Sequence, residues 1–185
     1  MSETKSVKPV TQKRLMNIAL YYLGRYESSA DNLRRLLKRR VAKAAMKGAD
    51  VPDESAEWIE SVVAEMKRAG YVNDSRFAAM TVEKYRKAGK SERFIRQKLA
   101  QAGIDPDGQG AALSTGDSAE NGDSDLDAAM RLVAKRRIGA FRPAQDRAAC
   151  RKKDLAVLAR AGFSFQTAVR ALGEYDGDGD EDVEY

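Results

Sequence analysis

The sequence contains no histidine and only one cysteine, Cys150. Histidine is the commonest general base and the commonest zinc ligand in proteins, and a lone thiol can form neither an internal disulfide nor a cysteine-rich metal site. The sequence also has no glycine-rich phosphate loop after an apolar strand and no Gly-x-Ser-x-Gly motif. We therefore predict a protein that is not an enzyme and that holds no metal and no cofactor.

Long apolar runs are absent as well. The sequence has no uninterrupted apolar run of about 18 residues, the length that a membrane-spanning helix requires. Its first ten residues lack the apolar centre of a signal peptide. The lone cysteine lies in a predicted helix and fits a reducing compartment. We expect a cytoplasmic protein with no membrane role.

Acidic residues are scarce over most of the chain, although the formal net charge is only +5. Half of the 28 acids lie within residues 105–127 and 174–185, so the rest of the chain is strongly basic. Such a surface favours binding to a polyanion or to an acidic protein. The ending "YDGDGDEDVEY" resembles a calcium loop, but Glu181 stands where that loop requires glycine. We predict a disordered acidic tail there.

Three segments between residues 11 and 70 have the apolar spacing of amphipathic helices. A cap at Ser28 or Ser29 begins the second segment, and Gly70 ends the third. Two similar groups follow, the first of them after a cap at Asn73 or Asp74. The predicted buried residues include Leu15, Ala19, Leu33, Leu37, Val62, Met66, Val82, Ile95, Leu99, Ala129, Met130, Val133, Leu158, Ala159 and Leu172.

These patterns predict an all-α fold of tandem three-helix repeats without strands. Gly108 and Gly110 interrupt the third helical pattern of the second repeat, which we therefore expect to be weak. The predicted order is a flexible leader over 1–10, repeat 1 over 11–70, repeat 2 over 71–104, a flexible acidic linker over 105–124, repeat 3 over 125–173 and an acidic disordered tail over 174–185.

Ala-Gly followed by a large apolar residue occurs three times, at Gly70, Gly103 and Gly162. Glycine adopts the left-handed conformation at a helix end without side-chain cost, and the apolar residue after it packs onto the last turn. We predict three equivalent helix ends. We assign to the hydrophobic core the aromatic residues on apolar stripes or beside helix ends: Tyr71, Phe77, Tyr85, Phe94, Phe163 and Phe165.

Basic residues recur on the second helix of each repeat and beside it, as in "NLRRLLKRR", "RKAGKSERFIRQKL" and "CRKKD". Charges on one amphipathic helix are usually a solvated face, but equivalent charges on stacked helices form a positive surface suited to phosphates or to an acidic groove. The candidate contact residues are Arg34, Arg35, Lys38, Arg39, Arg86, Lys87, Lys90, Arg93, Arg96, Lys152 and Lys153.

Three stretches together resemble RecX family regulatory proteins: "ALYYLGRYESSADNLRRLLKRR", "VVAEMKRAGYVNDSRFAAMTVEKYRKAGKSERFIRQKLAQAGI" and "LARAGFSFQTAVRAL". The resemblance extends from Leu15 to Leu172. It implies an elongated, curved molecule that lies in the groove of the RecA recombinase filament. It also implies a regulator, most often an inhibitor, of the recombination, ATPase and coprotease activities of RecA in DNA repair and the SOS response.

The resemblance implies two partners, the RecA filament and the single-stranded DNA within it, and no catalytic residue. We expect the protein to be a monomer. Two alternatives remain open at this point. One is an all-helical protein that binds DNA directly without a recombinase, and the other is a helical scaffold for a different protein.

Overall fold

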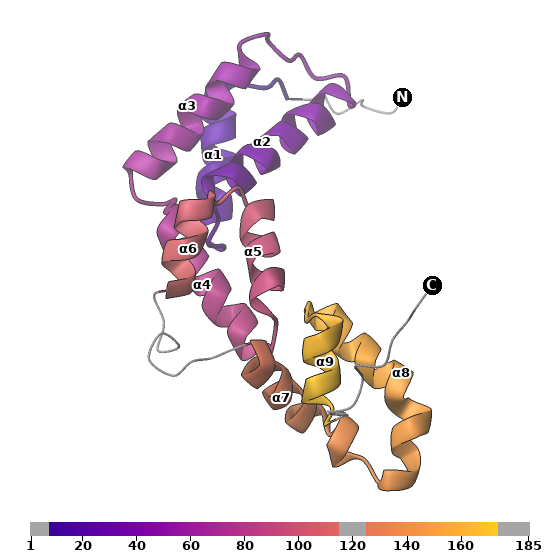
Figure 1. The fold of residues 1–185 in the computed structure, drawn as a ribbon. Coiled ribbons are helices and arrows are strands. Elements are labelled where there is room, and N and C mark those ends of the chain that lie inside the picture. Colours follow the sequence, from indigo (N-terminus) through magenta and orange to yellow (C-terminus); the bar gives the residue numbers. More distant parts are fainter. Residues whose placement is uncertain (1–7, 115–124, 174–185) are drawn as a thin grey trace, which may run out of the picture. The chain divides into compact units, whose positions relative to one another are not determined.

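The computed structural model describes residues 8–114 and 125–173, which form α-helices, one short 3-10 helix and no strand (Figure 1). The prediction of an all-α fold is confirmed. The helices are α1 (Gln12–Leu23), α2 (Ala30–Ala45), α3 (Ser55–Arg68), α4 (Asp74–Lys87), α5 (Glu92–Gln101), α6 (Pro106–Ser114), α7 (Asp125–Arg136), η2 (Gly139–Phe141), α8 (Ala144–Ala161) and α9 (Phe165–Ala171).

The chain divides into two compact units. Of the described residues, unit 1 comprises 8–79 and 99–109, and unit 2 comprises 80–98, 110–114 and 125–173. The division passes through α4, α5 and α6, so unit 1 holds the start of α4 and the end of α5. The repeat boundaries drawn from the sequence differ from this division and stay predictions.

The core of unit 1 is built from the apolar stripes of α1, α2 and α3, which pack on one another (Figure 1). Leu15 of α1, Leu33 and Leu37 of α2 and Val62 of α3 are almost fully buried, as the helical spacing predicts. Val10 belongs to the same core, and its backbone N–H donates to the carbonyl of Asp50 at 3.1 Å. Val10 is therefore part of the fold and not of a flexible leader.

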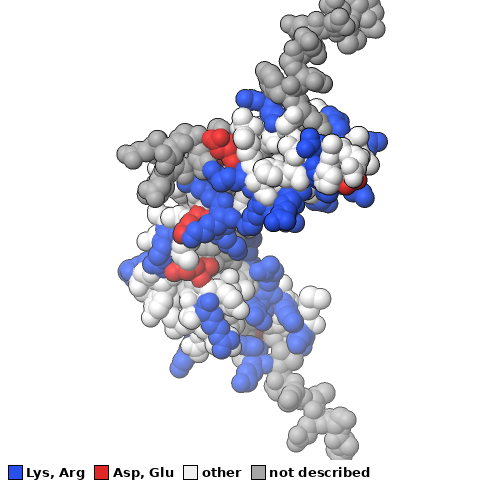
Figure 2. Space-filling view, turned by 90° about the horizontal axis from the view of Figure 1, so that it is seen from below, with Lys and Arg blue, Asp and Glu red and all other residues white. Residues whose placement is uncertain are grey.

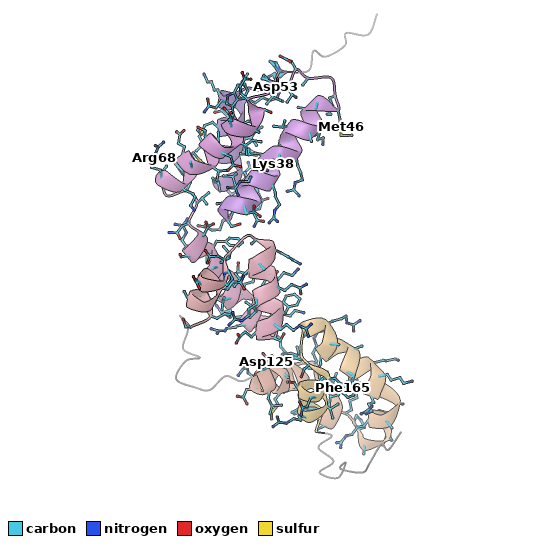
Figure 3. The ribbon with its side chains drawn as sticks, turned by 45° about the horizontal axis from the view of Figure 1, so that its top comes forward. Lys38, Met46, Asp53, Arg68, Asp125 and Phe165 are labelled. Carbon is cyan, nitrogen blue, oxygen red and sulfur yellow. The ribbon has the colours of Figure 1, made fainter. Side chains whose placement is uncertain are left out.

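The core of unit 2 lies among α7, α8 and α9, with Leu132, Val133, Leu158 and Leu172 buried. Four residues that we expected to be buried lie at the surface instead. Met130, Phe165 (Figure 3) and Ala159 of this unit are exposed, and so is Tyr71 of unit 1. Tyr71 lies between α3 and α4, where no helical spacing applies. For Met130, Ala159 and Phe165, helical spacing alone does not decide how deeply a side chain at the edge of a stripe is buried.

The predicted glycine helix ends are confirmed. Gly70 and Gly103 both have φ of +77°, and Gly162 has φ of +96°, so all three are in the left-handed region. Ile104 and Phe163 fold back after their glycines, and their backbone N–H groups donate to Leu99 O and Leu158 O. After Gly70 the residue that folds back is Val72, which is 2% exposed, whereas Tyr71 is 52% exposed.

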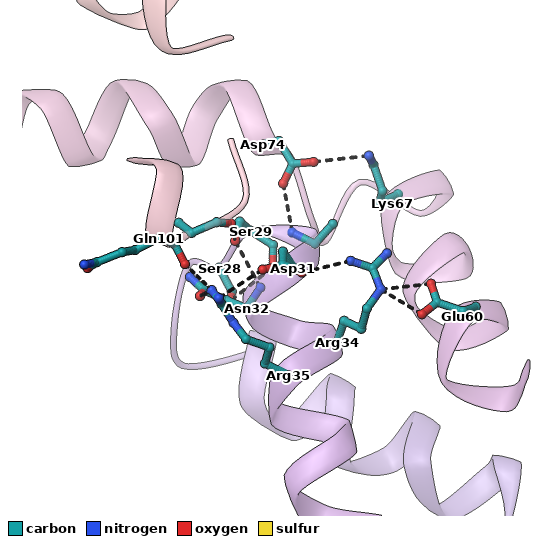
Figure 4. Close-up of polar contacts among 12 residues, drawn as sticks. Ser28, Ser29, Asp31, Asn32, Arg34, Arg35, Glu60, Lys67, Asp74 and Gln101 are labelled. Carbon is teal, nitrogen blue, oxygen red and sulfur yellow. Dashed lines mark hydrogen bonds and ion pairs between the residues drawn. The ribbon is translucent and has the colours of Figure 1, made fainter. Parts of the chain in front are cut away.

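The structure gives a second reason for two of these glycines. In unit 1 the carbonyl of Ala102, just before Gly103, accepts a hydrogen bond from Ser29 Oγ at 2.5 Å, and Ser29 also caps α2 (Figure 4). A Cβ atom on Gly103 would overlap the side chain of Asp31, with Asp31 Cγ at 2.9 Å. The end of α5 thus lies directly against the start of α2.

Asp74, the first residue of α4, completes this junction in unit 1. Its carboxylate accepts the backbone N–H of Ala30 at 2.8 Å, which satisfies one of the free donors at the start of α2. The other carboxylate oxygen accepts Lys67 Nζ at 3.2 Å. The actual cap of α4 is Asn73, whose side chain accepts the N–H of Arg76.

Unit 2 contains a junction of the same design. The carbonyl of Ala161, just before Gly162, accepts the backbone N–H of Ser91 at 3.0 Å. Asp125, the first residue of α7, accepts the N–H of Glu92 at the start of α5 at 3.0 Å. Asp74 accepts the N–H of Ala30 at the start of α2 in the same way. A Cβ atom on Gly162 would overlap Phe94 Cβ at 2.7 Å. The recurrence of Ala-Gly therefore reflects a repeated contact between helix ends, in addition to a repeated helix stop.

Replacing Gly103 with alanine is expected to destabilise unit 1 more than replacing Gly70 with alanine. Both glycines have the same φ, which costs an alanine about 1 kcal/mol. Nothing lies within 4 Å of a Cβ atom at Gly70, whereas at Gly103 it would collide with Asp31. The collision is expected to add about 2 kcal/mol. Urea unfolding followed by circular dichroism measures the difference, and equal losses would contradict the close approach.

The structure departs from the sequence prediction at residues 106–114. These residues form α6, whereas we expected a linker beginning at residue 105 with room for only a short helix around residues 110–113. The side chain of Asp105 accepts the N–H of Gly108 at 2.6 Å and so caps the helix, and Leu113 is 9% exposed. A cap and a buried side chain thus compensate for two helix-weakening glycines. The remainder of the predicted linker (115–124), most of the leader (1–7) and the tail (174–185) lie outside the described residues.

Candidate partner-binding surface

Two of the candidate cations on α2 are engaged within unit 1. Arg34 donates through Nε to Glu60 Oε1 at 2.7 Å and pairs with Asp31 at 3.2 Å, which ties α2 to α3 (Figure 4). The hydrogen bond to Glu60 raises the pKa of Arg34. Arg35 pairs with Asp31 at 3.2 Å and donates to the carbonyl of Gln101 at the end of α5. These two cations hold helices together.

Further along α2 the cations are free. Lys38, Arg39, Arg40 and Lys43 are exposed, and none of them has an ion-pair or hydrogen-bond partner among the described residues. We call these four residues the α2 basic face. Lys38 projects from the middle of α2 (Figure 3). Because α2 has no acid after Asp31, the positive charge of this face is not neutralised by its own helix.

The candidate cations around the α4–α5 turn of unit 2 divide in the same way. Arg86 donates to the carbonyl of Leu113 at 2.7 Å, and Lys90 donates to the carbonyl of Arg160 at 3.3 Å, so both satisfy helix C-termini. Lys87 and Arg96 form pairs one turn apart on their own helices, with Glu83 and Glu92. Arg93 is exposed and has no partner among the described residues.

On α8, Lys152 and Lys153 are exposed and equally without partners in the described part of the chain. Their neighbour Asp154 is 1% exposed, and its carboxylate accepts two hydrogen bonds from Arg142 at 2.8 Å and one from the N–H of Gly139 at 3.0 Å. Arg142 lowers the pKa of Asp154 by these hydrogen bonds, although burial opposes the effect. Sequence analysis missed this pair because "CRKKD" looks uniformly exposed.

The candidate residues thus fall into two groups. Lys38, Arg39, Arg93, Lys152 and Lys153 offer unneutralised charge to a partner. The remaining six are held by acids or by carbonyl groups of their own unit. Figure 2 shows that Lys and Arg side chains spread over the visible face, with few acidic side chains between them. Such a surface attracts anionic partners and repels cationic ones.

A groove in unit 1, which we call the α1–α2 groove, was missed by the sequence analysis. Its volume is about 730 Å³. Its polar lining has three tyrosines, five cations, one asparagine and no acid: Tyr21, Tyr22, Tyr26, Arg14, Arg25, Arg40, Lys43, Lys47 and Asn17. The signal in the sequence is "YYLGRY", where tyrosines cluster at a helix end next to an arginine.

Two other kinds of site are not found in the described part of the chain. Residues 8–114 and 125–173 contain no group of three or more His, Cys, Asp or Glu side chains placed to hold a metal ion. None of the helices described is both long enough and apolar enough to cross a membrane. Cys150 is half-buried and forms no disulfide.

Comparisons with known proteins agree with one another. A family model described as the second three-helix domain of RecX matches residues 73–113. The chain is 37% identical over 169 residues to the regulatory protein RecX of Myxococcus xanthus. This match covers 91% of this chain and 89% of the Myxococcus protein. It is 28% identical to the regulatory protein RecX of Agrobacterium fabrum, with coverage of 92% and 89%.

Solved structures with the same fold have the same family name. A crystal structure of regulatory protein RecX matches with a TM-score of 0.58 and 22% identity, over 88% of this chain and 71% of that chain. The structure of RecX from Lactobacillus salivarius matches with a TM-score of 0.56 and 17% identity, over 89% and 96%. The structures support the fold, and the identity to the Myxococcus protein over nearly the whole chain establishes the family. The chain belongs to the RecX family of regulatory proteins.

Proposed function

We propose that this protein binds the filament that the RecA recombinase forms on single-stranded DNA and lowers its recombination, ATPase and coprotease activities. The observation that supports this most directly is the set of exposed cations on α2, at the start of α5 and on α8 that have no partner within residues 8–114 and 125–173. A filament that contains nucleic acid is a polyanion, and unneutralised cations bind such a polymer. Membership of a family of regulatory proteins agrees with this role.

The proposed mechanism is binding without chemistry. The part of the chain that the structure describes offers no metal-binding group, and the sequence has no histidine. A regulator of this kind shifts the equilibrium between filament states toward the state that it binds more tightly. The size of the shift is set by the ratio of its affinities for those states. Occupancy of a filament end or groove would then block growth or favour loss of subunits, and activity would fall with filament length.

The contact residues that we propose are Lys38, Arg39, Arg93, Lys152 and Lys153. We leave Arg34, Arg35, Arg86 and Lys90 out of this proposal because their side chains already bind groups of their own units. Arg96 and Lys87 are also outside the proposed set, because each is paired with an acid of its own helix. We propose that the protein acts in the cytoplasm as a monomer.

A titration of ATP hydrolysis tests the proposal. The single-stranded-DNA-dependent ATPase rate of the RecA protein from the same organism is measured while this protein is added well below one molecule per recombinase subunit. We expect the rate to fall at these amounts, because one bound regulator affects many subunits of a polymer. Bovine serum albumin at equal concentration is the control for nonspecific effects.

An unchanged ATPase rate up to one molecule per recombinase subunit would contradict the proposal. If the protein then bound bare DNA tightly, with a steep dependence of affinity on salt, the alternative of a direct DNA-binding protein would replace it. If the ATPase rate fell only as far as this protein removed free single-stranded DNA by binding it, the protein would likewise be a direct DNA-binding protein. Adding excess DNA separates these cases, because it restores the rate only when sequestration of DNA is the cause.

A further inference from the structure

The α1–α2 groove of unit 1 presents aromatic rings that the fold does not bury. Tyr21, near the end of α1, is 65% exposed, and Tyr26, just after that helix, is 60% exposed. Exposed aromatic rings gathered at one concave site are typical of ligand recognition. Contact with water is unfavourable for such rings, and a bound ligand would cover them. Tyr71, the other tyrosine of unit 1 that is more than half exposed, is not among the residues that line the groove.

Neighbouring groups hold these rings in place. The guanidinium of Arg25 lies 4.1 Å from the centre of the Tyr21 ring and also donates to the Tyr21 hydroxyl. The rings of Tyr22 and Tyr26 are 5.3 Å apart at an interplanar angle of 37°. Ordered rings lose little further freedom when a flat ligand stacks on them, which favours binding. The groove is thus organised before a ligand arrives.

The charge of the groove has one sign. Arg40, Lys43 and Lys47 line it on the α2 side, are exposed, and have no partner among the described residues. Arg14 donates to the backbone carbonyls of Lys8 and Pro9, which leaves its positive charge uncompensated by an acid. No Asp or Glu lines the groove. The ligand that fits is therefore an anion.

We propose that the α1–α2 groove binds a short segment of single-stranded nucleic acid. Unstacked bases lie against Tyr21 and Tyr26, and the phosphates lie near Arg40, Lys43 and Lys47. Single strands combine flat bases with regularly spaced negative charge, which matches tyrosines and cations within one groove. An acidic peptide would satisfy the cations but has few flat faces for the rings. In a duplex the bases are stacked inside and do not reach them.

This inference deepens the proposed function, because it assigns a nucleic-acid contact to unit 1 alone. Its test needs no recombinase, so its failure and the failure of the proposed function are separate results. The volume of the groove, about 730 Å³, is in the range of pockets that hold one small ligand, so a segment of few nucleotides is sufficient.

The test is fluorescence anisotropy of a labelled oligo-dT strand with the full-length protein and its variants. We expect the Tyr21→Ala, Tyr26→Ala double variant to weaken binding by about tenfold or more, because each lost stacking contact contributes a substantial part of the affinity. The Lys43→Gln, Lys47→Gln double variant should lower the slope of log affinity against log salt by about 1.4, since each phosphate contact contributes about 0.7 for single strands.

Matched controls lie outside the groove in the same unit. Tyr71→Ala removes another tyrosine that is more than half exposed, and Arg68→Gln removes an exposed cation at the end of α3 (Figure 3). Both control variants should bind oligo-dT as the original protein does. Far-UV circular dichroism checks that every variant keeps its helix content.

Three results would overturn the inference. One is undiminished binding by the tyrosine double variant with its helix content intact. Another is equal affinity for an abasic strand of the same length, which would mean that the rings bind no base. The third is an acidic peptide that displaces the strand and binds the protein more tightly than oligo-dT does. If the tyrosine double variant also bound this peptide more weakly, the groove would be assigned to a protein partner.

Discussion

Replacing Asp154 with alanine is expected to destabilise the protein by about 3 kcal/mol or more, a severe effect for one side chain. Asp154 is 1% exposed and accepts hydrogen bonds from the Arg142 guanidinium and from the N–H of Gly139. Removing the carboxylate leaves the N–H of Gly139, a buried residue, without its acceptor and Arg142 without its partner. The turn through η2 and its packing on α8 depend on these bonds.

Urea unfolding followed by far-UV circular dichroism measures this loss. The matched control is Asp146→Asn, an exposed acid in the first turn of the same helix, which should change stability by about 0.5 kcal/mol or less. The fluorescence of Trp58, the only tryptophan, reports on α3 of unit 1 and shows whether that unit unfolds in the same transition. A midpoint for Asp154→Ala equal to that of the control would contradict the structural role of the pair.

The same interaction has a defined pH dependence. Arg142 lowers the pKa of Asp154 in the folded protein, so folding favours the ionised carboxylate. The stabilisation is therefore fully present above the pKa of the unfolded chain and is lost as the pH falls through the lower pKa of the folded state. Comparing the stability of the original protein and of Asp154→Ala across that acidic range should show the difference between them shrinking as the pH falls.

Reversing two cations of the α2 basic face is expected to weaken binding to the recombinase filament by about thirtyfold. The variant is Lys38→Glu, Arg39→Glu. Both residues are exposed and unpaired within the described structure, so the change places negative charge against a polyanion without breaking an internal bond. We assign each reversal about 1 kcal/mol, and about 2 kcal/mol corresponds to that change in affinity.

The matched control is Lys13→Glu, Arg68→Glu, which changes the net charge equally in the same unit. Lys13 and Arg68 are exposed on α1 and α3, without partners among the described residues. Filament binding is measured by co-sedimentation with RecA on single-stranded DNA at fixed salt. Equal losses in the two variants would mean that net charge alone matters, and the α2 basic face would not be the contact surface.

The helices and their ends were determined by the sequence. Leu15, Leu33 and Val62 recur at helical spacing, and Gly70, Gly103 and Gly162 end helices because glycine alone adopts the left-handed conformation without cost. These features depend on residues a few positions apart in the chain. Local sequence therefore predicted the all-α class, most helix boundaries and a cap at Ser28 or Ser29, of which Ser29 is the cap in the structure.

The functions of the individual charges and rings were decided only by the tertiary structure. Sequence does not distinguish Arg34, which binds Glu60 of another helix, from Lys38, which has no described partner one turn later. Asp154 ends a run of charged residues and is nevertheless buried, whereas Phe165 was expected in the core and is 69% exposed. The physical reason is that burial and ion pairing depend on neighbours distant in the chain. Only the folded packing of helix on helix brings those neighbours within hydrogen-bond distance.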